Sequence, residues 1–158
     1  MSAAGEEVHA TAVAVRGRGL LILGAPGAGK SRLALEMAAL GAGIVADDAV
    51  ALRPGRPPVL AAPGRWPGLV EVRGLGLIAV EPHPPVPCLA AIDLSAAPAG
   101  DRLPEHGRLA LAGTDVTLLR WGLGAPYAAA LVAYLEAGGS HPGTDRADPP
   151  DQLPPDGT

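Results

Sequence analysis

The sequence contains no phenylalanine, and aromatic residues make up only 3% of its 158 residues. The core must therefore be aliphatic, and the aromatic platforms on which single-stranded nucleic acids stack are scarce. Charged residues amount to 18%, and the net charge of −4 provides no basic surface for nucleic acid or an anionic membrane. We expect neither of these partners.

Cysteine is equally rare, because Cys88 is the single one and has no partner for an internal disulfide. This fits a reducing cytoplasm, with Cys88 as a small buried apolar residue. No apolar run approaches the roughly 18 residues that a membrane-spanning helix needs. The N-terminal residues Glu6 and Glu7 do not resemble the basic start of a signal peptide. We therefore expect a cytoplasmic protein.

Glycine and proline are plentiful, with 22 and 18 residues, yet 48% of the chain is hydrophobic, which argues against global disorder. The length predicts a single domain. Residues 138–158 differ from the rest, because they hold five prolines and four aspartates against one arginine. We expect a folded domain over residues 6–137 and a disordered, acidic, proline-rich tail over residues 138–158.

Two segments have a helical pattern, residues 30–40 and residues 127–136, and each is followed by glycines that favour helix termination. The other apolar segments are short, with turn residues between them, and indicate strands. They are residues 8–15, 20–23, 44–46, 49–52, 58–61, 68–72, 77–80, 89–94, 108–112 and 115–119. Two helices among so many strands do not make a repeated strand–helix–strand alternation. The pattern predicts a mixed, strand-rich α/β fold with hairpins.

One complete motif carries chemistry: it matches G-x-x-x-x-G-K-[ST] and lies between an apolar strand and a helix, which is the context that such a phosphate loop requires. Its residues are Gly24, Ala25, Pro26, Gly27, Ala28, Gly29, Lys30 and Ser31. The glycines let backbone N–H groups turn toward phosphate oxygens, and the helix N-terminus adds positive charge. Lys30 suits the β- and γ-phosphates, and the Ser31 hydroxyl suits Mg²⁺. The motif predicts a nucleotide-binding site.

Two carboxylates, Asp47 and Asp48, end the apolar strand of residues 44–46. The helix after Ser31 should return the chain to a strand that neighbours the strand before the loop. The pair would then lie at the same sheet edge as the phosphates. An acid in that place can hold Mg²⁺ or accept the proton of an attacking hydroxyl.

These motifs together resemble the kinase domain of HPr kinase/phosphorylase. The phosphate loop is followed by V-A-D-D-A-V at residues 45–50, and residues 71–78 resemble that family's E-x-R-G-L-G-x-I signature. Residues 8–11 resemble its V-H-G-T segment, and residues 101–103 resemble its late D-R-L. The resemblance covers about residues 8–103 in the family's order. It implies a P-loop kinase domain with a fold like that of phosphoenolpyruvate carboxykinase, in a short form without the family's N-terminal domain.

The resemblance also implies a role for each matching residue. The phosphate loop binds ATP, and Ser31 and Glu71 are the Mg²⁺ ligands. Asp48 is the general base in phosphorylation and the general acid in the reverse step. Lys30 and three further residues act at the phosphates, namely His9, Arg73 and Arg102. The implied activity is a serine/threonine-protein kinase that regulates a phosphotransferase system, with an HPr-like phosphocarrier as substrate and a homo-oligomer, a hexamer, as assembly.

The late part of the chain departs from the family. Residues 120–124 read R-W-G-L-G where the family has R-P-G-R-N, so the second arginine is missing. Phosphorolysis of the phosphoserine needs two anions side by side, and we expect it to be weak. Two other functions stay open: an ATP-binding regulatory or sensor module without turnover, and a small-molecule kinase. The carboxylates Asp48 and Glu71 disfavour the first, and the lack of an arginine-bearing lid disfavours the second.

Overall fold

The structure, a computed structural model, describes residues 6–64 and 66–140. Within these residues the chain forms two helices and eleven strands. In chain order they are β1 (Glu7–Val8), β2 (Thr11–Val15), β3 (Arg18–Leu23), α1 (Lys30–Ala39), β4 (Gly43–Ala46), β5 (Val50–Arg53), β6 (Val59–Ala61), β7 (Leu69–Val72), β8 (Gly76–Ala79), β9 (Val86–Asp93), β10 (Gly107–Leu111), β11 (Thr114–Leu119) and α2 (Ala128–Ala137). Neither helix is long and apolar enough to span a bilayer.

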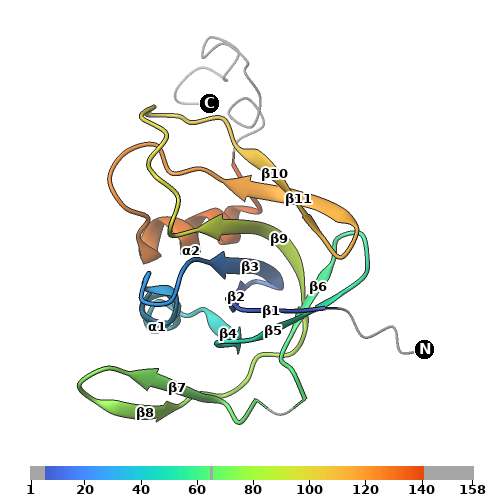
Figure 1. Cartoon of the computed structure of the whole chain (residues 1–158), viewed down its shortest axis with the longest axis vertical. Helices are drawn as coiled ribbons and strands as arrows, with labels where there is room; N and C mark the ends of the chain where they lie inside the picture. Colours follow the sequence, from blue (N-terminus) through green and yellow to red (C-terminus); the bar gives the residue numbers. More distant parts are fainter. Residues whose placement is uncertain (1–5, 65, 141–158) are drawn as a thin grey trace.

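Strand β9 lies in the middle of the large sheet (Figure 1). One of its edges pairs in parallel with β3, while the other edge pairs in parallel with β11 and, at its beginning, antiparallel with β6. Strand β2 lies between β3 and β4 and is antiparallel to both. Strands β3, β4, β9 and β11 therefore run in the same direction. We call the side of the sheet where these four strands end the carboxyl edge.

The central strands are buried on both faces, and their side chains alternate between two apolar clusters. Leu20 and Ile22 of β3 belong to the cluster under the helices, whereas Leu21 belongs to the cluster on the opposite face. Ala90 and Ile92 of β9 divide from Ala91 in the same way. Ala12 and Ala14 of β2 and Ala90 and Ala91 of β9 are buried, so small aliphatic side chains fill the core of a chain that has no phenylalanine.

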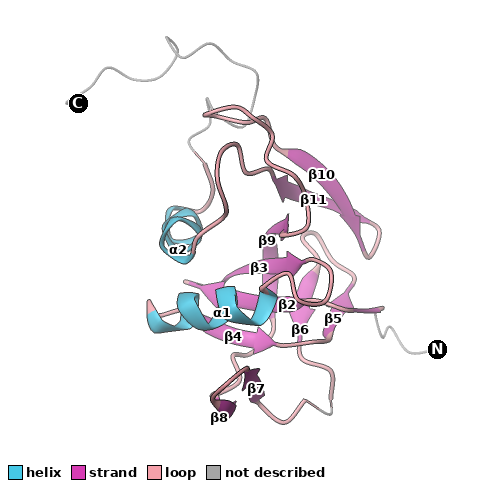
Figure 2. Cartoon of the chain, turned by 60° about the vertical axis from the view of Figure 1, so that its left-hand side comes forward, coloured by secondary structure: helices cyan, strands magenta, loops and turns pink. Residues whose placement is uncertain are grey.

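Both helices lie on one face of the large sheet (Figure 2). Each buries four residues at positions i, i+3, i+4 and i+7, the spacing of a single helix face. In α1 these are Lys30, Leu33, Ala34 and Met37, and in α2 they are Ala128, Leu131, Val132 and Leu135. Apart from Lys30, the buried face of each helix is therefore apolar and packs on the sheet.

The end of α2 is held by a residue from a distant strand. The last turn of α2 contains no basic residue, but Nη1 of Arg18 donates hydrogen bonds to the carbonyls of Leu135 (3.0 Å) and Glu136 (2.9 Å). Gly138 then ends the helix with φ 79°, a conformation that glycine adopts without a steric penalty. The cation at the helix C-terminus also complements the helix dipole.

Strands β7 and β8 form a separate two-stranded hairpin that lies beside α1 (Figures 1 and 2). Val70 is 1% exposed and joins the cluster under the helices, so the hairpin is attached through one face of β7. Side chains alternate along a strand, and the neighbours of Val70 therefore face away from the core. Leu69 and Glu71 are both exposed.

The mixed, strand-rich architecture predicted from the sequence is confirmed, and every predicted helix and strand is present. One expectation is wrong: β4 is not the neighbour of β3, because β2 lies between them. The two strands nevertheless end at the same edge. The tail predicted for residues 138–158 lies, from residue 141 onward, outside the described residues. Cys88 is buried as expected, and its burial raises the thiol pKa to about 12.

Candidate active site

The phosphate loop connects the end of β3 to the start of α1 at the carboxyl edge. Gly27 has φ 84° and Gly29 has φ 100°, a left-handed conformation that side chains disfavour and that the tight curl of the loop requires. Gly29 is also the N-cap of α1, and in the described chain no side chain caps this end and no acidic residue occupies the first turn. The first N–H groups of the helix therefore lack side-chain acceptors. Such a helix start attracts anions.

Lys30 lies over this loop with only 7% of its surface exposed. Its Nζ donates hydrogen bonds to the carbonyl oxygens of Gly24 (2.8 Å) and Ala25 (3.2 Å). The loop carbonyls thus hold the ammonium group beside the backbone that would surround a phosphate. A compact, fully charged donor in this position suits a polyphosphate.

Asp47 connects the loop to two strands through hydroxyl groups. Ser31 Oγ donates to Asp47 Oδ1 at 2.8 Å and lies 3.1 Å from Oδ2, and Thr11 Oγ1 donates to Oδ1 at 2.8 Å. Thr11 is fully buried and Asp47 is 6% exposed, so the hydrogen bond between them is shielded from water, whereas those of Ser31 are only partly buried. The proton of Ser31 is committed to Asp47, which leaves the serine lone pairs free to face a cation. This arrangement fits a Mg²⁺ ion, which prefers oxygen ligands.

Asp48 and His9 lie at the same edge but differ from Asp47 in exposure. Asp48 directly follows Asp47 and is exposed, with φ 65° turning the backbone after β4. His9 is exposed in the bend before β2, two residues from the buried Thr11. Because β2 begins where β4 ends, the topology brings His9, Asp48 and the phosphate loop to one end of the sheet. A carboxylate open to solvent here is accessible to an incoming hydroxyl.

Glu71 and Arg73 lie outside this cluster. Both are exposed on the β7–β8 hairpin, and across the described ranges no hydrogen bond or ion pair links either one to the phosphate loop. Residues 6–64 and 66–140 contain no group of three His, Cys, Asp or Glu side chains that is able to hold a metal ion by itself. The structure therefore brings together Ser31 and Asp47, but not Ser31 and Glu71.

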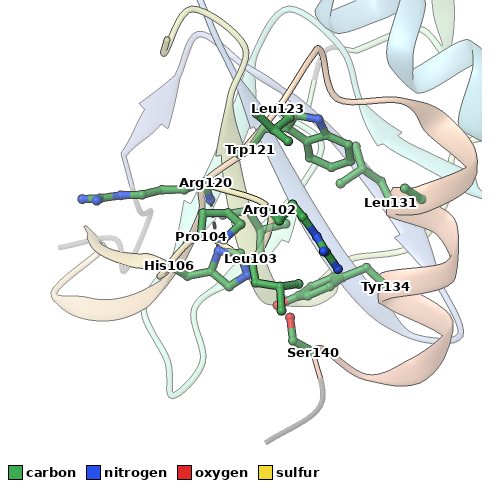
Figure 3. Close-up of a pocket in the computed structure, with 13 residues that line it drawn as sticks. Arg102, Leu103, Pro104, His106, Arg120, Trp121, Leu123, Leu131, Tyr134 and Ser140 are labelled. Carbon is green, nitrogen blue, oxygen red and sulfur yellow. Dashed lines mark hydrogen bonds between the residues drawn. The ribbon is translucent and has the colours of Figure 1, made fainter. Parts of the chain in front are cut away.

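Arg102 occupies a different place, a cleft of about 310 Å³ between the segment before β10 and helix α2. Its guanidinium group points toward Tyr134 of α2, whereas Arg120 on the same cleft extends away from it (Figure 3). Both arginines are exposed. Arg102 thus lies beside α2 and makes no described hydrogen bond with the phosphate loop.

Sequence reasoning missed two residues that fix the loop. Thr11 anchors Asp47, as described above. Ser95, just after β9, accepts a hydrogen bond from the backbone N–H of Ala25 at 2.8 Å, and its own N–H donates to Asp93 Oδ1 at 2.9 Å. The acid at the end of the apolar β9 repeats the pattern of β4 and Asp47. Because an acid at the end of an apolar strand is visible in the sequence, this second strand end at the carboxyl edge could have been predicted.

The family model and the curated relatives that match this chain point to the same family. The model of the HPr Serine kinase C-terminal domain matches residues 2–83. The HPr kinase/phosphorylase of Bordetella pertussis is 49% identical over 73 residues, which cover 45% of this chain and 24% of that protein. The corresponding enzyme of Mycoplasmopsis pulmonis is 47% identical over 73 residues, covering 46% and 24%. This chain spans about a quarter of the length of the curated relatives it matches.

The fold also has a counterpart among solved structures. The structure of the Hpr(Ser) kinase/phosphatase from Coxiella burnetii superposes with a TM-score of 0.69, covering 84% of this chain and 88% of that one. The sequence identity over this superposition is 20%. The similarity therefore extends beyond residue 83 at the level of the fold.

Proposed function

This chain belongs to the HPr serine kinase C-terminal domain family, and on that premise we propose that it is an ATP-dependent kinase that phosphorylates a serine of an HPr-like phosphocarrier protein. One observation carries the proposal: the phosphate-loop residue Ser31 is hydrogen-bonded to Asp47, and the exposed Asp48 follows directly. A phosphate-binding loop beside an accessible carboxylate combines the two elements that phosphoryl transfer to a hydroxyl needs.

In this proposal residues 24–31 bind the phosphates of ATP. The loop amides and the start of α1 surround the β-phosphate, and Lys30 moves from the loop carbonyls to the β- and γ-phosphate oxygens. Mg²⁺ is held by Ser31, with Asp47 fixing the serine hydroxyl, and when bound it offsets the negative charge of the phosphates. Glu71 is the proposed second ligand of Mg²⁺, and the Mg²⁺ dependence of a Glu71→Gln variant tests this role.

Asp48 is the proposed general base. It accepts the proton of the acceptor serine as the serine oxygen forms its bond to the γ-phosphorus, and ADP leaves. General-base catalysis of this kind contributes about 10²–10⁴-fold in rate. We propose that His9, Arg73 and Arg102 offset charge on the transferring group. Arg73 and Arg102 are both exposed, so neither is prevented by burial from reaching a bound substrate.

The reverse reaction should be weak in this chain. Phosphorolysis places inorganic phosphate beside phosphoserine, and nearby cations must offset the repulsion between these two anions. In the segment after β11 only Arg120 is cationic, and its side chain extends away from the cleft (Figure 3). Pyrophosphate release from phosphorylated HPr-like protein and millimolar phosphate should be far slower than the kinase reaction. Comparable rates would contradict this proposal.

We further propose a fold of the phosphoenolpyruvate carboxykinase type, action in the cytoplasm, regulation of a phosphotransferase system, and assembly into a homo-oligomer such as a hexamer. Sedimentation analysis of the purified protein tests the assembly directly. A monomer at micromolar concentration would contradict it.

The proposed activity is tested by incubating the protein with labelled ATP, Mg²⁺ and a purified HPr-like phosphocarrier. We expect label on a single serine of the phosphocarrier, identified by mass spectrometry. ATP binding without transfer to any protein would instead indicate a nucleotide-sensing module. Transfer to a metabolite in a small-molecule panel, with no labelled protein, would indicate a small-molecule kinase.

A further inference from the structure

The cleft that holds Arg102 is also the place where the described part of the chain ends. We call it the α2 cleft; its volume is about 310 Å³, and Ser140, the last described residue, is one of the residues that line it. Residues 141–158 follow Ser140 and lie outside the described residues. We call them the acidic segment. We propose that the acidic segment binds in the α2 cleft of its own chain, with its carboxylates on Arg102 and its prolines on the aromatic side chains of the cleft.

The α2 cleft exposes apolar and aromatic side chains. Leu103 and Leu123 both line it, and they are 64% and 57% exposed. Its aromatic members, Trp121 after β11 and Tyr134 of α2, are half-buried (Figure 3). An exposed apolar patch in a depression indicates a surface that another segment covers. Grooves lined by aromatic side chains are the surfaces on which extended, proline-rich segments dock.

The charge of the α2 cleft is of one sign. Arg102 and Arg120 both line it and are exposed, and no Asp or Glu of the described residues belongs to its lining. The guanidinium group of Arg102 points toward Tyr134, whereas Arg120 extends away from the cleft (Figure 3). With the described residues Arg102 makes no hydrogen bond or ion pair, and its exposed neighbours Asp101 and Glu105 lie outside the lining. Arg102 is therefore a cation that a carboxylate from another segment is able to reach.

The acidic segment carries the opposite charge in a regular pattern. It contains four aspartates and one arginine, a formal charge of −3. Asp145, Asp148 and Asp151 are three residues apart, and two Pro-Pro pairs follow or surround them at positions 149–150 and 154–155. Such prolines favour the polyproline II helix, which has three residues per turn and rises about 9 Å per turn. In that conformation the three aspartates share one face, and a carboxylate on this face forms a charge-assisted hydrogen bond with Arg102.

Chain connectivity favours this occupant over a separate protein. Pro142 and Gly143 form a pair typical of the centre of a type II turn, which reverses the chain just beyond the rim of the cleft. Asp148 is eight residues beyond Ser140, a reach of at most about 29 Å. So short a tether gives an effective concentration in the millimolar range, and a contact with a dissociation constant of about 1 mM is then formed for a large part of the time. The proposed role of Arg102 at the transferring phosphoryl group requires the segment to leave the cleft.

A nitroxide spin label on the acidic segment tests the contact in the full chain. Cys88 is the single cysteine and is buried, so Gln152→Cys supplies one reactive thiol for the label. The label broadens the NMR signals of protons near it, and the indole N–H groups of Trp66 and Trp121 give one signal each. Trp66 shortly precedes the β7–β8 hairpin, which lies at the opposite end of the molecule from β10 and β11 (Figure 1). We expect the Trp121 signal to lose most of its intensity and the Trp66 signal to keep it.

Two kinds of charge change show whether Arg102 holds the segment. Arg102→Glu should restore the Trp121 signal, whereas Arg53→Glu, at an exposed arginine outside the cleft, should not. Replacing Asp145, Asp148 and Asp151 together by asparagine should also restore it, while Asp156→Asn alone should leave the loss in place. Raising the salt from 0.1 M to 1 M shortens the Debye length from about 10 Å to about 3 Å and should weaken the loss.

Three results would overturn the proposal. They are an undiminished Trp121 signal, equal losses at both tryptophans, and a loss that neither Arg102→Glu nor the triple asparagine variant reverses. A mixture of isotope-labelled chains with separately spin-labelled chains identifies the source of the segment. Broadening in that mixture as strong as within one chain would assign the cleft to a second copy and contradict binding within the chain. None of these measurements uses ATP or an acceptor protein, so their outcome does not depend on the proposed function.

Discussion

Replacing Thr11 by valine tests the buried hydrogen bonds that hold Asp47. Valine keeps the shape of threonine but removes the hydroxyl that donates to Asp47 Oδ1 at 2.8 Å. Thr11 is fully buried and Asp47 is 6% exposed, so water cannot easily take the place of the lost donor. A hydrogen bond to a charged acceptor is worth about 1.5–3 kcal/mol. We expect the free energy of unfolding to fall by that amount.

Urea denaturation measures this change. With a denaturant slope of about 2 kcal/mol per molar, the unfolding midpoint should fall by about 0.8–1.5 M. Thr117→Val is the matched control, because the Thr117 hydroxyl accepts only an exposed hydrogen bond of 3.3 Å from Arg108. The control should change stability by less than about 0.5 kcal/mol.

A double-mutant cycle makes the test specific to the contact between Thr11 and Asp47. In an Asp47→Ala background the acceptor is gone, so Thr11→Val should cost almost nothing. The coupling energy between the two residues should therefore exceed about 1 kcal/mol. The reasoning is refuted if Thr11→Val costs less than about 0.5 kcal/mol, or if it costs the same in both backgrounds.

Three further predictions follow from single contacts. Lys30→Ala should weaken ATP binding strongly in calorimetry, because it removes the one buried cation of the loop; equal affinities would exclude the phosphate-loop assignment. Arg18→Met should lower the free energy of unfolding by about 1–2 kcal/mol, because two hydrogen bonds to the end of α2 are lost. The exposed neighbour Arg16 provides the control Arg16→Met, and equal effects of the two changes would contradict the capping role. Cys88, with its pKa raised to about 12 by burial, should resist a thiol reagent at pH 8 until urea unfolds the chain. Rapid labelling of the native protein would show that the thiol is accessible.

Local patterns in the sequence were sufficient to predict the helices and strands and the tight turn of residues 24–31 between β3 and α1. Two of these patterns involve only residues close together in the chain. They are the i, i+3, i+4, i+7 spacing of α1 and the turn glycines between short apolar runs. The Gly24–Ser31 motif likewise encodes its own geometry, since Gly27 and Gly29 adopt conformations that few other residues tolerate. These features are local, and a sequence displays them directly.

Long-range pairings were not accessible in this way. The hydrogen bond from Thr11 to Asp47 joins residues 36 apart, and those from Arg18 to the end of α2 join residues 117 and 118 apart. Both depend on strand order, and the insertion of β2 between β3 and β4 has no local signature. The position of Glu71 could not be predicted for the same reason, because the β7–β8 hairpin packs through contacts of Val70 with the distant core cluster and of β7 with α1. Its proposed role as a Mg²⁺ ligand stays a prediction.

One comparison of rates decides whether Asp48 acts as the general base in phosphoryl transfer. The initial rate of phosphate transfer from labelled ATP to an HPr-like phosphocarrier is measured for the wild type and for Asp48→Asn, with ATP affinity checked by calorimetry. An exposed base should be dispensable for binding but needed for the chemical step. We predict a loss of about 10²–10⁴-fold in rate with ATP affinity unchanged. A rate within about threefold of the wild type would contradict it.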